Sequence, residues 1–461
     1  MVFSSITFLF YFLPITLALY YLLPQRCRNY VLLIASLIFY AFGEPTYIIL
    51  MIFSIIFTYI YGILIDKYRE KSKIFLLLAI CTSIGLLIYF KYTNFIIKNI
   101  NLWLTNKIDF INVVLPIGIS FYTFQVLSYI VDLYRNECKV QKNIFKLALY
   151  VTLFPQLIAG PIVRYVDIEE QLEKRTHSFE MFALGVRRFV IGLGKKVLIA
   201  NVCGSFIQAF LNSNEKSVLF YWLYGIAVML QIYFDFSGYS DMAIGLGKMF
   251  GFEFLENFNY PYVATSVTDF WRRWHMSLST WFRDYVYIPL GGNRVSKLKW
   301  IRNIFVVWML TGIWHGAEWN FVIWGLYFGV ILLLEKLFLG KLLEKLPQII
   351  SRIYVLITVM ISFIIFSGEN TPQIFENLSG LIGYKNVQLI SFESIYYFKS
   401  YLIVLMMGMI GSTPLMKKLI GNEKNTKIIN VVEPIFLVAI LLLSTSYIVD
   451  GSFNPFLYFR F

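Results

Sequence analysis

The chain has 461 residues, of which 58% are hydrophobic, with a mean hydropathy of +0.67 and a net charge of +13. Soluble proteins average about 45–50% apolar residues, so this composition excludes an ordinary soluble domain. The positive charge therefore indicates basic loops beside anionic lipid, or an anionic nucleotide-bearing donor in the cytoplasm, and not a nucleic-acid partner.

Apolar runs of roughly 18 or more residues recur along almost the whole chain, which predicts an all-α polytopic membrane protein. No linker or internal repeat divides the sequence, so we expect one integral-membrane domain over residues 1–461. It should contain about 11–13 membrane helices, some of them broken or re-entrant. The first run lacks a basic n-region and a cleavage site, which favours a retained span over a signal peptide. The predicted spans are 3–23, 29–43, 46–65, 74–90, 112–132, 146–163, 183–210, 217–234, 303–313, 319–337, 350–367, 399–411 and 430–449.

Loop charge predicts the orientation of these spans. Basic residues follow the first, third and fifth spans, at 26–28, 66–73 and 135–146. Alternating topology places these loops on one side, and the positive-inside rule makes that side cytoplasmic. The N-terminus is then expected outside. The segment 91–111 is an exception, because its three lysines would also lie outside.

A polar centre covers about 233–320, inside an otherwise apolar chain. It opens with Asp235 and Asp241 at the end of an apolar helix, with Gly238 and two serines between them. This spacing predicts either a break in the helix or close backbone packing. Buried carboxylates need partners, and nearby arginines are the candidates, so a structural network is one interpretation of this segment.

A second polar segment is predicted to be a helix from Ser266 to about Tyr287. Ser266-Val-Thr-Asp269 matches a capping box at its start. The segment is too polar to cross lipid exposed, so we expect it in the membrane interface or lining a hydrated cavity. His275 falls on the same helical face as Trp271 and therefore either lines that cavity or is a packed histidine.

The third segment, 303–335, is apolar and longer than the about 20 residues that one span needs. Gly312 and Gly316 bracket His315, so a helix break is expected there. Glu318 would orient the imidazole if the backbone between them were helical. A histidine at membrane depth tends to mark chemistry or a substrate path, and a structural histidine bridging helices is the alternative.

These features favour acyl transfer. Imidazole has an unperturbed pKa of about 6.5 and can take a hydroxyl proton near neutral pH, a contribution worth roughly 10²–10⁴ in rate. A thioester donor is already activated, and the chain has no Gly-x-Ser-x-Gly elbow that would indicate a serine hydrolase. We predict His315 and His275 as the catalytic residues. Side chains predicted to contact substrate along the path are Trp271, Trp274, Trp314, Glu318, Asp241 and Asp269.

The other reactive side chains predict little chemistry. The four cysteines are far apart and form no Cys-x-x-Cys, so no metal site and no redox pair is expected. The third histidine, His177, lies in the polar stretch 169–180 and is expected to be a loop residue.

At these residues the chain resembles the membrane-bound O-acyltransferases, and most of all the branch that acetylates alginate and other bacterial polysaccharides. The resemblance extends over essentially the whole chain, and its Phe-Trp-x-Arg-Trp-His and Trp-His-Gly motifs are specific. The matching segments are Pro116-Ile-Gly-Ile-Ser-Phe-Tyr-Thr-Phe-Gln125, Ile158-Ala-Gly-Pro-Ile-Val-Arg-Tyr165, Tyr233-Phe-Asp-Phe-Ser-Gly-Tyr-Ser-Asp241, Asp269 through Arg294, Thr311-Gly-Ile-Trp-His-Gly-Ala317 and Asn454-Pro-Phe-Leu-Tyr-Phe-Arg-Phe461.

The resemblance implies a multi-pass protein of the bacterial cytoplasmic membrane, with helices around a central funnel or tunnel. His315 matches the family's essential histidine and His275 its second histidine. Acetyl-CoA is the expected donor substrate on the cytoplasmic side, with no bound cofactor. The expected acceptor is an extracytoplasmic, esterase-like partner protein that passes the acetyl group to a cell-surface polysaccharide, or the glycan itself.

Two departures and two alternatives accompany the resemblance. Phe328 stands where relatives are expected to have a further histidine, and the chain is shorter at its C-terminal end, which puts alginate itself in doubt. A sister branch of the family moves D-alanine from a phosphopantetheine carrier to teichoic acid, but Tyr287-Ile-Pro-Leu-Gly-Gly-Asn-Arg294 is more similar to the polysaccharide branch. A transporter or flippase would also use broken helices and polar groups at membrane depth.

Overall fold

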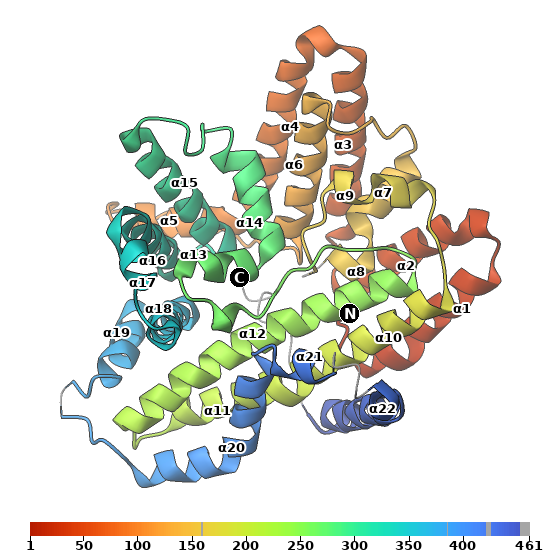
Figure 1. The fold of residues 1–461 in the computed structure, drawn as a ribbon. Helices are drawn as coiled ribbons and strands as arrows, with labels where there is room; N and C mark the ends of the chain where they lie inside the picture. The colour runs from red at the N-terminus through yellow and green to blue at the C-terminus, as the bar shows by residue number, and fades with distance from the viewer. Residues whose placement is uncertain (158–159, 385, 421–425, 452–461) are drawn as a thin grey trace. The chain divides into compact units, whose positions relative to one another are not determined.

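The computed structural model describes residues 1–157, 160–384, 386–420 and 426–451, and the regular secondary structure of these residues is entirely helical (Figure 1). This confirms the predicted all-α polytopic class. Backbone contacts divide the chain into two compact units. The first contains Met1–Phe189 and Ser240–Leu255, and the second contains Val190–Tyr239 and the described residues from Glu256 onward.

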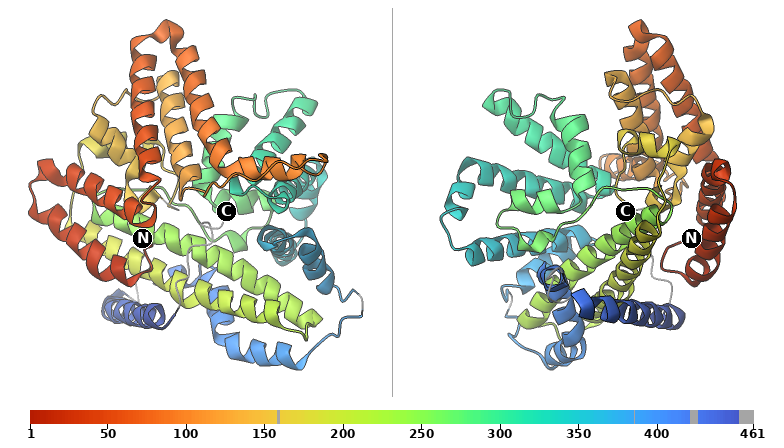
Figure 2. Two further views of the ribbon diagram at one scale, coloured as in Figure 1. Left: turned by 180° about the vertical axis from the view of Figure 1, so that it is seen from behind. Right: turned by 45° about the vertical axis from the view of Figure 1, so that its right-hand side comes forward.

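The first unit is organised around three long helices that pack side by side, α3, α4 and α6 (Figures 1 and 2). Gly62 of α3 lies so close to α6 that a Cβ there would stand 2.9 Å from the hydroxyl of Tyr129. The chain then turns away from α4 into α5 through a π-helical turn, η4 (Figure 2). The elements of this unit are η1 Phe8–Phe12, α1 Leu13–Leu22, η2 Gln25–Cys27, α2 Arg28–Gly43, α3 Ile48–Lys67, η3 Arg69–Lys71, α4 Ser72–Leu87, η4 Ile88–Tyr92, α5 Thr93–Ile100, α6 Ile119–Arg135, α7 Ile144–Thr152, α8 Phe154–Leu157, α9 Tyr165–Glu173 and the first part of α10 Phe179–Gly194.

The second unit holds both predicted catalytic histidines. Its tightest crossing joins α15 and α16, where a Cβ on Gly312 would lie 2.3 Å from the carbonyl oxygen of Phe321. Helix α12, Val218–Met249, begins in this unit and ends in the first. The other elements are η5 Lys195–Ala200, α11 Asn201–Asn212, η6 Pro261–Val263, α13 Val267–Arg273, α14 Met276–Phe282, η7 Arg283–Tyr287, α15 Lys297–His315, α16 Trp319–Leu334, η8 Glu335–Leu339, α17 Gly340–Leu343, α18 Gln348–Ser367, α19 Thr371–Gly380, α20 Phe392–Gly411, α21 Leu415–Ile420 and α22 Thr426–Asp450.

Among the described residues, eight helical segments are long and apolar enough to span a membrane. The expected number of 11–13 is larger because it includes shorter apolar helices, such as α2 with 16 residues and α6 with 17. Phe8–Leu22 is a further apolar helix of this shorter kind. The eight are Ile48–Lys67, Arg69–Ile100, Phe179–Asn212, Val218–Met249, Trp319–Leu343, Gln348–Ser367, Phe392–Gly411 and Val431–Asp450.

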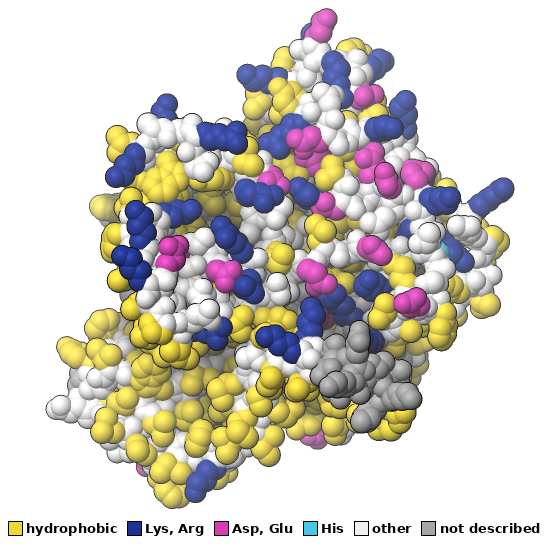
Figure 3. All heavy atoms as spheres, viewed as in Figure 1, with side chains coloured by type: hydrophobic (Ala, Val, Ile, Leu, Met, Phe, Trp, Pro, Cys, Tyr) yellow, Lys and Arg dark blue, Asp and Glu magenta, His cyan; other side chains and the backbone are white. Residues whose placement is uncertain are grey.

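The surfaces of the two units fit a lipid environment when each is considered by itself. In the second unit, α20 exposes large apolar side chains such as Phe392 and Ile403, and hydrophobic atoms dominate that region in Figure 3. In the first unit, charged residues gather at the tip between α3 and α4, over 66–73. Apolar helix sides with charged connections are the pattern of a multi-pass membrane protein.

Candidate functional site

His315 is the last residue of α15, at the helix break that the sequence predicts. Gly316 is extended, and α16 begins at Trp319. A Cβ at 316 would lie 2.1 Å from the ring of Phe321, so any other residue there would have to displace that buried ring. The imidazole is 4% exposed.

Aromatic rings surround His315. Its imidazole centroid lies 5.0 Å from that of Trp314, 5.0 Å from that of Trp324 and 5.3 Å from that of Phe366. In such an apolar surrounding, electrostatic interactions with a substrate are stronger than in water.

His275 does not lie within a continuous helix, so the prediction of one helix from Ser266 to Tyr287 is wrong at this point. Helix α13 ends at Arg273, and His275 takes a left-handed backbone conformation, φ 42° and ψ 54°, before α14 begins. For a residue other than glycine this conformation costs roughly 1–2 kcal/mol. The shared helical face that the sequence predicts for Trp271 and His275 therefore does not exist across this break.

Asn257 holds the turn at His275, a role that sequence reasoning missed. Its Oδ1 atom lies 3.1 Å from Nδ1 of His275 and accepts hydrogen bonds from the N–H of Ser277 at 3.3 Å and its Oγ at 2.9 Å. The backbone oxygen of Asn257 also accepts from the N–H of Met276 at 3.0 Å. The only signal in the sequence is an asparagine inside an apolar, aromatic stretch.

Burial sets the ionisation of His275. The side chain is 1% exposed, and burial lowers the pKa of its imidazole from 6.5 to about 3. His275 is therefore neutral near pH 7 and can accept a hydrogen bond at one ring nitrogen.

Trp314 lies against both histidines. Its ring centroid is 6.2 Å from that of His275 and 5.0 Å from that of His315. One tryptophan ring therefore contacts both imidazoles. Two segments that are distant in sequence thus form one buried aromatic centre.

The other predicted tryptophans have different surroundings. Trp271 contacts the rings of Trp308 at 4.6 Å and Trp324 at 5.7 Å, and Trp324 in turn contacts His315. Trp274 instead stacks on Phe270 at 5.5 Å. Phe328, at the place of the missing further histidine, is fully buried against Trp271, with ring centroids 4.9 Å apart.

The predicted carboxylates are dispersed. Asp241 accepts hydrogen bonds from Arg188 at 2.8 and 3.0 Å, both residues being in the first unit. Asp269 pairs with Arg273 one turn along α13, 3.0 Å away. Glu318 is exposed and extended at the start of α16, so the helical backbone that would let it orient His315 is absent. Substrate contact by these residues stays a prediction.

A buried ion pair joins Asp235 to Lys196, with side chains 2% and 3% exposed. Helix α12 runs through this region without a break, so close packing is the correct alternative at Gly238. A Cβ at Gly238 would lie 2.8 Å from the carbonyl oxygen of Gly192. Lys196, a lysine that the sequence did not single out, is thus a partner of Asp235.

His177 lies in a non-helical segment, as predicted, but it is well connected within the first unit. Its Nε2 is 2.8 Å from the hydroxyl of Tyr20, and its Nδ1 is 3.2 Å from a guanidinium nitrogen of Arg28. Burial, Arg28 and Arg175 lower the pKa of this imidazole. These contacts indicate a structural role.

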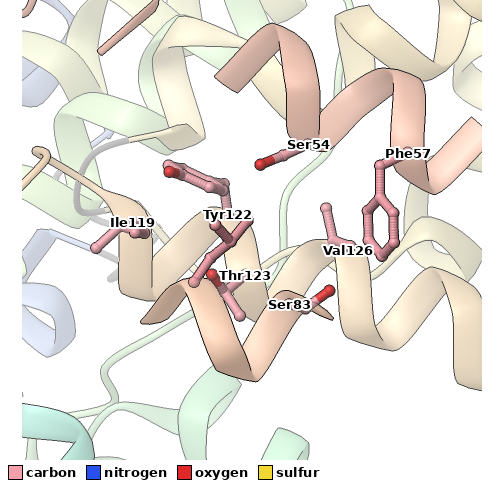
Figure 4. A pocket seen from close by; sticks show the side chains of 8 residues that line it. Ser54, Phe57, Ser83, Ile119, Tyr122, Thr123 and Val126 are labelled. Carbon is pink, nitrogen blue, oxygen red and sulfur yellow. The ribbon is translucent and has the colours of Figure 1, made fainter. Parts of the chain in front are cut away.

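A small pocket of the first unit lies between α3, α4 and α6 and includes no predicted site residue (Figure 4). Within the described residues, no group of three or more His, Cys, Asp or Glu side chains is arranged to hold a metal ion. The familial segment 454–461 lies outside the described residues.

Comparison with known proteins matches the chain to one protein family and to several acyltransferases. The sequence model of the membrane-bound O-acyltransferase family matches residues 34–371. The chain is 42% identical over 399 residues to the probable alginate O-acetylase of Pseudomonas aeruginosa, covering 84% of this chain and 76% of that protein. It is 34% identical over 427 residues to the peptidoglycan O-acetyltransferase of Helicobacter pylori, covering 84% and 81%. It is 31% identical over 277 residues to the teichoic acid D-alanyltransferase of Bacillus subtilis, covering 56% and 70%.

Proposed function

Because this chain belongs to the membrane-bound O-acyltransferase family, we propose that it acetylates a polysaccharide outside the cytoplasm. As a family member it is a multi-pass membrane acyltransferase. Two relatives named for glycan O-acetylation each match 84% of the chain. The relative named for D-alanyl transfer matches 56% at lower identity, which favours acetylation.

The proposed donor is acetyl-CoA, which reaches the protein from the cytoplasm across a bacterial inner membrane. Basic loops on the cytoplasmic side would attract this anionic thioester. The proposed acceptor is a hydroxyl of an extracytoplasmic partner protein that passes the acetyl group to the glycan, or a hydroxyl of the glycan itself. Transfer from one side to the other requires a path through the membrane domain, as the family resemblance implies.

In the proposed mechanism His315 is the general base. A ring nitrogen of His315 takes the hydroxyl proton while the hydroxyl oxygen attacks the thioester carbonyl carbon. The C–S bond then breaks, and the proton passes from the imidazolium to the departing thiolate, which restores the neutral imidazole. The observation that carries this role is the place of His315, buried at a helix break among three aromatic rings.

The test is His315→Ala in cells that depend on this protein for glycan acetylation. We expect the variant to reach the membrane at normal levels. The rate at which the surface glycan gains acetyl groups should fall roughly 10²–10⁴-fold, the usual contribution of a general base. His177→Gln is the matched control and should retain acetylation, because His177 belongs to a structural cluster of the first unit. Normal acetylation in His315→Ala would refute the assignment.

D-alanyl transfer is the second candidate function, supported by the similarity to the teichoic acid enzyme. Purified protein is given labelled acetyl-CoA or a D-alanylated carrier protein, and thioester consumption is measured for each. Acetylation predicts consumption of acetyl-CoA alone. A transporter would instead move substrate without consuming either thioester.

A further inference from the structure

The hydrogen bonds of Asn257 determine which nitrogen of His275 carries a proton. The backbone N–H of Ser277 can only donate, so the side-chain atom of Asn257 that faces it is the oxygen, Oδ1. The same oxygen lies 3.1 Å from Nδ1 of His275. An oxygen acceptor requires a donor, and Nδ1 therefore bears the hydrogen. In a neutral imidazole, Nε2 is then left with its lone pair.

This lone pair of His275 is buried inside the second unit. Among the residues that the structure describes, Nε2 has no hydrogen-bond partner. The imidazole instead meets two aromatic rings, Phe236 edge-on with centroids 4.6 Å apart and Trp314 at 6.2 Å. Buried acceptors in native proteins are nearly always satisfied, so an exception in a candidate active site needs an explanation.

Two further costs fall on the same residue. His275 holds a left-handed backbone, which is uncommon for residues other than glycine. Burial also lowers the pKa of its ring. Nε2 therefore stays unprotonated near pH 7, and its lone pair still lacks a hydrogen-bond donor among the described residues. Strain and unsatisfied polar groups persist in a fold where the surroundings enforce them, and they gather at functional sites.

We propose that Asn257 and His275 form a hydrogen-bond-accepting subsite, in which Nε2 of His275 receives one O–H or N–H group of a bound substrate. The donor is either the hydroxyl-bearing acceptor or an amide of the thioester's pantetheine arm, which present the same chemistry. His275 binds and orients, whereas proton transfer belongs to His315. The inference rests on the proposed function only in naming these two substrates.

The first experiment measures the tautomer directly and needs no activity. The chain has three histidines, so ¹⁵N-histidine labelling gives three pairs of imidazole nitrogen signals, which His177→Gln and His315→Gln variants assign. We expect His275 at pH 7 to show a protonated Nδ1 and a lone-pair Nε2. Asn257→Leu should produce a mixture of tautomers, and Asn257→Asp, which keeps an oxygen acceptor, should preserve Nδ1–H. A protonated Nε2 in the unaltered chain would overturn the proposal.

The second experiment measures which substrate uses the subsite. Membranes carrying Asn257→Leu are assayed with labelled acetyl-CoA and with the hydroxyl acceptor, either the partner protein or the cell-surface glycan, each varied in turn. The KM of one substrate should rise several-fold, because only part of the tautomer mixture keeps Nε2 as an acceptor, with kcat changed less. A higher KM for acetyl-CoA identifies the thioester arm as the donor, and a higher KM for the acceptor identifies its hydroxyl.

The matched control is Asn259→Leu, the same substitution two residues along at an exposed side chain, which should leave both KM values unchanged. If neither KM moves in Asn257→Leu, then Nε2 holds a structural water only and the subsite is refuted. Failure of the general-base role in His315→Ala would leave the tautomer result intact. The two hypotheses therefore fail separately.

Discussion

The carboxylate of Glu335 caps the helix that begins at Val267, accepting the N–H of that residue at 2.6 Å. It also accepts the N–H and the Oγ1 hydroxyl of Thr268, at 2.9 and 2.8 Å. Glu335 is 5% exposed and continues the helix that starts just after His315, whereas α13 ends just before His275. One buried carboxylate thus links the two histidine-bearing segments.

Glu335→Gln should loosen α13 and impair catalysis. The hydroxyl of Tyr354 is a fourth donor to this carboxylate, at 3.3 Å. Glutamine cannot accept from all four donors as the carboxylate does, and it removes a negative charge that favours a helix N-terminus. We expect faster hydrogen exchange at the amides of Val267 and Thr268, and a fall in kcat of roughly tenfold, about 1.4 kcal/mol in the barrier. Hydrogen-exchange mass spectrometry of the membrane protein in detergent measures the first effect.

The control is Glu344→Gln, at an exposed glutamate just beyond the same helix, which should change neither quantity. Unchanged exchange at Val267 and Thr268 in Glu335→Gln would show that the capping contacts do not stabilise α13.

Breaking the ion pair between Lys196 and Asp235 should cost more stability than breaking an exposed pair of this chain. Asp235→Asn removes the charge that balances a buried ammonium, and breaking one partner of such a pair costs about 3–5 kcal/mol. Thermal unfolding in detergent should show a large loss of stability. The double variant Lys196→Met with Asp235→Leu should recover most of it, because two apolar side chains leave no unbalanced charge.

The comparison pair is Lys216 with Glu376, where the glutamate side chain is 55% exposed and the charges are 2.9 Å apart. Glu376→Gln should cost less than about 1 kcal/mol, since water screens that interaction. Equal losses of stability in Asp235→Asn and Glu376→Gln would mean that burial does not raise the cost of breaking an ion pair in this chain.

The close crossing of α15 and α16 should not tolerate a methyl group. Gly312→Ala would place a Cβ 2.3 Å from the backbone oxygen of Phe321, and backbone cannot swing aside as a flexible side chain does. The helices must separate, which displaces the segment holding His315 and lowers both stability and acetylation. Gly85→Ala in α4 is the matched change, because no atom lies within 4 Å of its Cβ. It should be neutral or stabilising by up to about 1 kcal/mol, the helix preference of alanine over glycine.

The two histidine segments show what the sequence could and could not reveal. The break at His315 was predictable, because its two flanking glycines lie in an apolar run too long for one span. The break at His275 was not, since Trp274, His275 and Met276 contain neither glycine nor proline. That turn depends on hydrogen bonds that residues 275–277 donate to Asn257, and such distant contacts leave no local pattern.

The pairing of charges shows the same limit. That Asp235 and Asp241 need partners follows from their apolar surroundings, but Lys196 as the partner of Asp235 follows only from how α12 and η5 pack. The sequence predicted the packing of α12 only as one of two alternatives. Gly238 indicated either a break or a close approach, and only the fold distinguishes a continuous helix from an interrupted one.

Histidine burial predicts a loss of stability in mild acid. The pKa of His275 falls from 6.5 to about 3 on folding, so below pH 6.5 the unfolded chain binds more protons than the folded one. The free energy of unfolding therefore carries the full contribution above about pH 6.5 and loses it progressively as the pH falls toward 3. Between pH 7.5 and 5 this single residue should remove about 2 kcal/mol, since the slope approaches 1.36 kcal/mol per pH unit below pH 6.5.

The measurement is the thermal stability of the unaltered chain and of His275→Asn from pH 7.5 to 5. Asparagine tolerates a left-handed backbone and does not titrate, so the variant isolates the ionisation of His275 from the other acid-sensitive groups. His177 acts in the same direction, because burial and two arginines lower the pKa of its ring as well. His177→Gln should accordingly remove only part of the acid dependence, and His275→Asn a larger part. An identical pH slope in the unaltered chain and His275→Asn would mean that His275 is charged, or reaches water, in the folded protein.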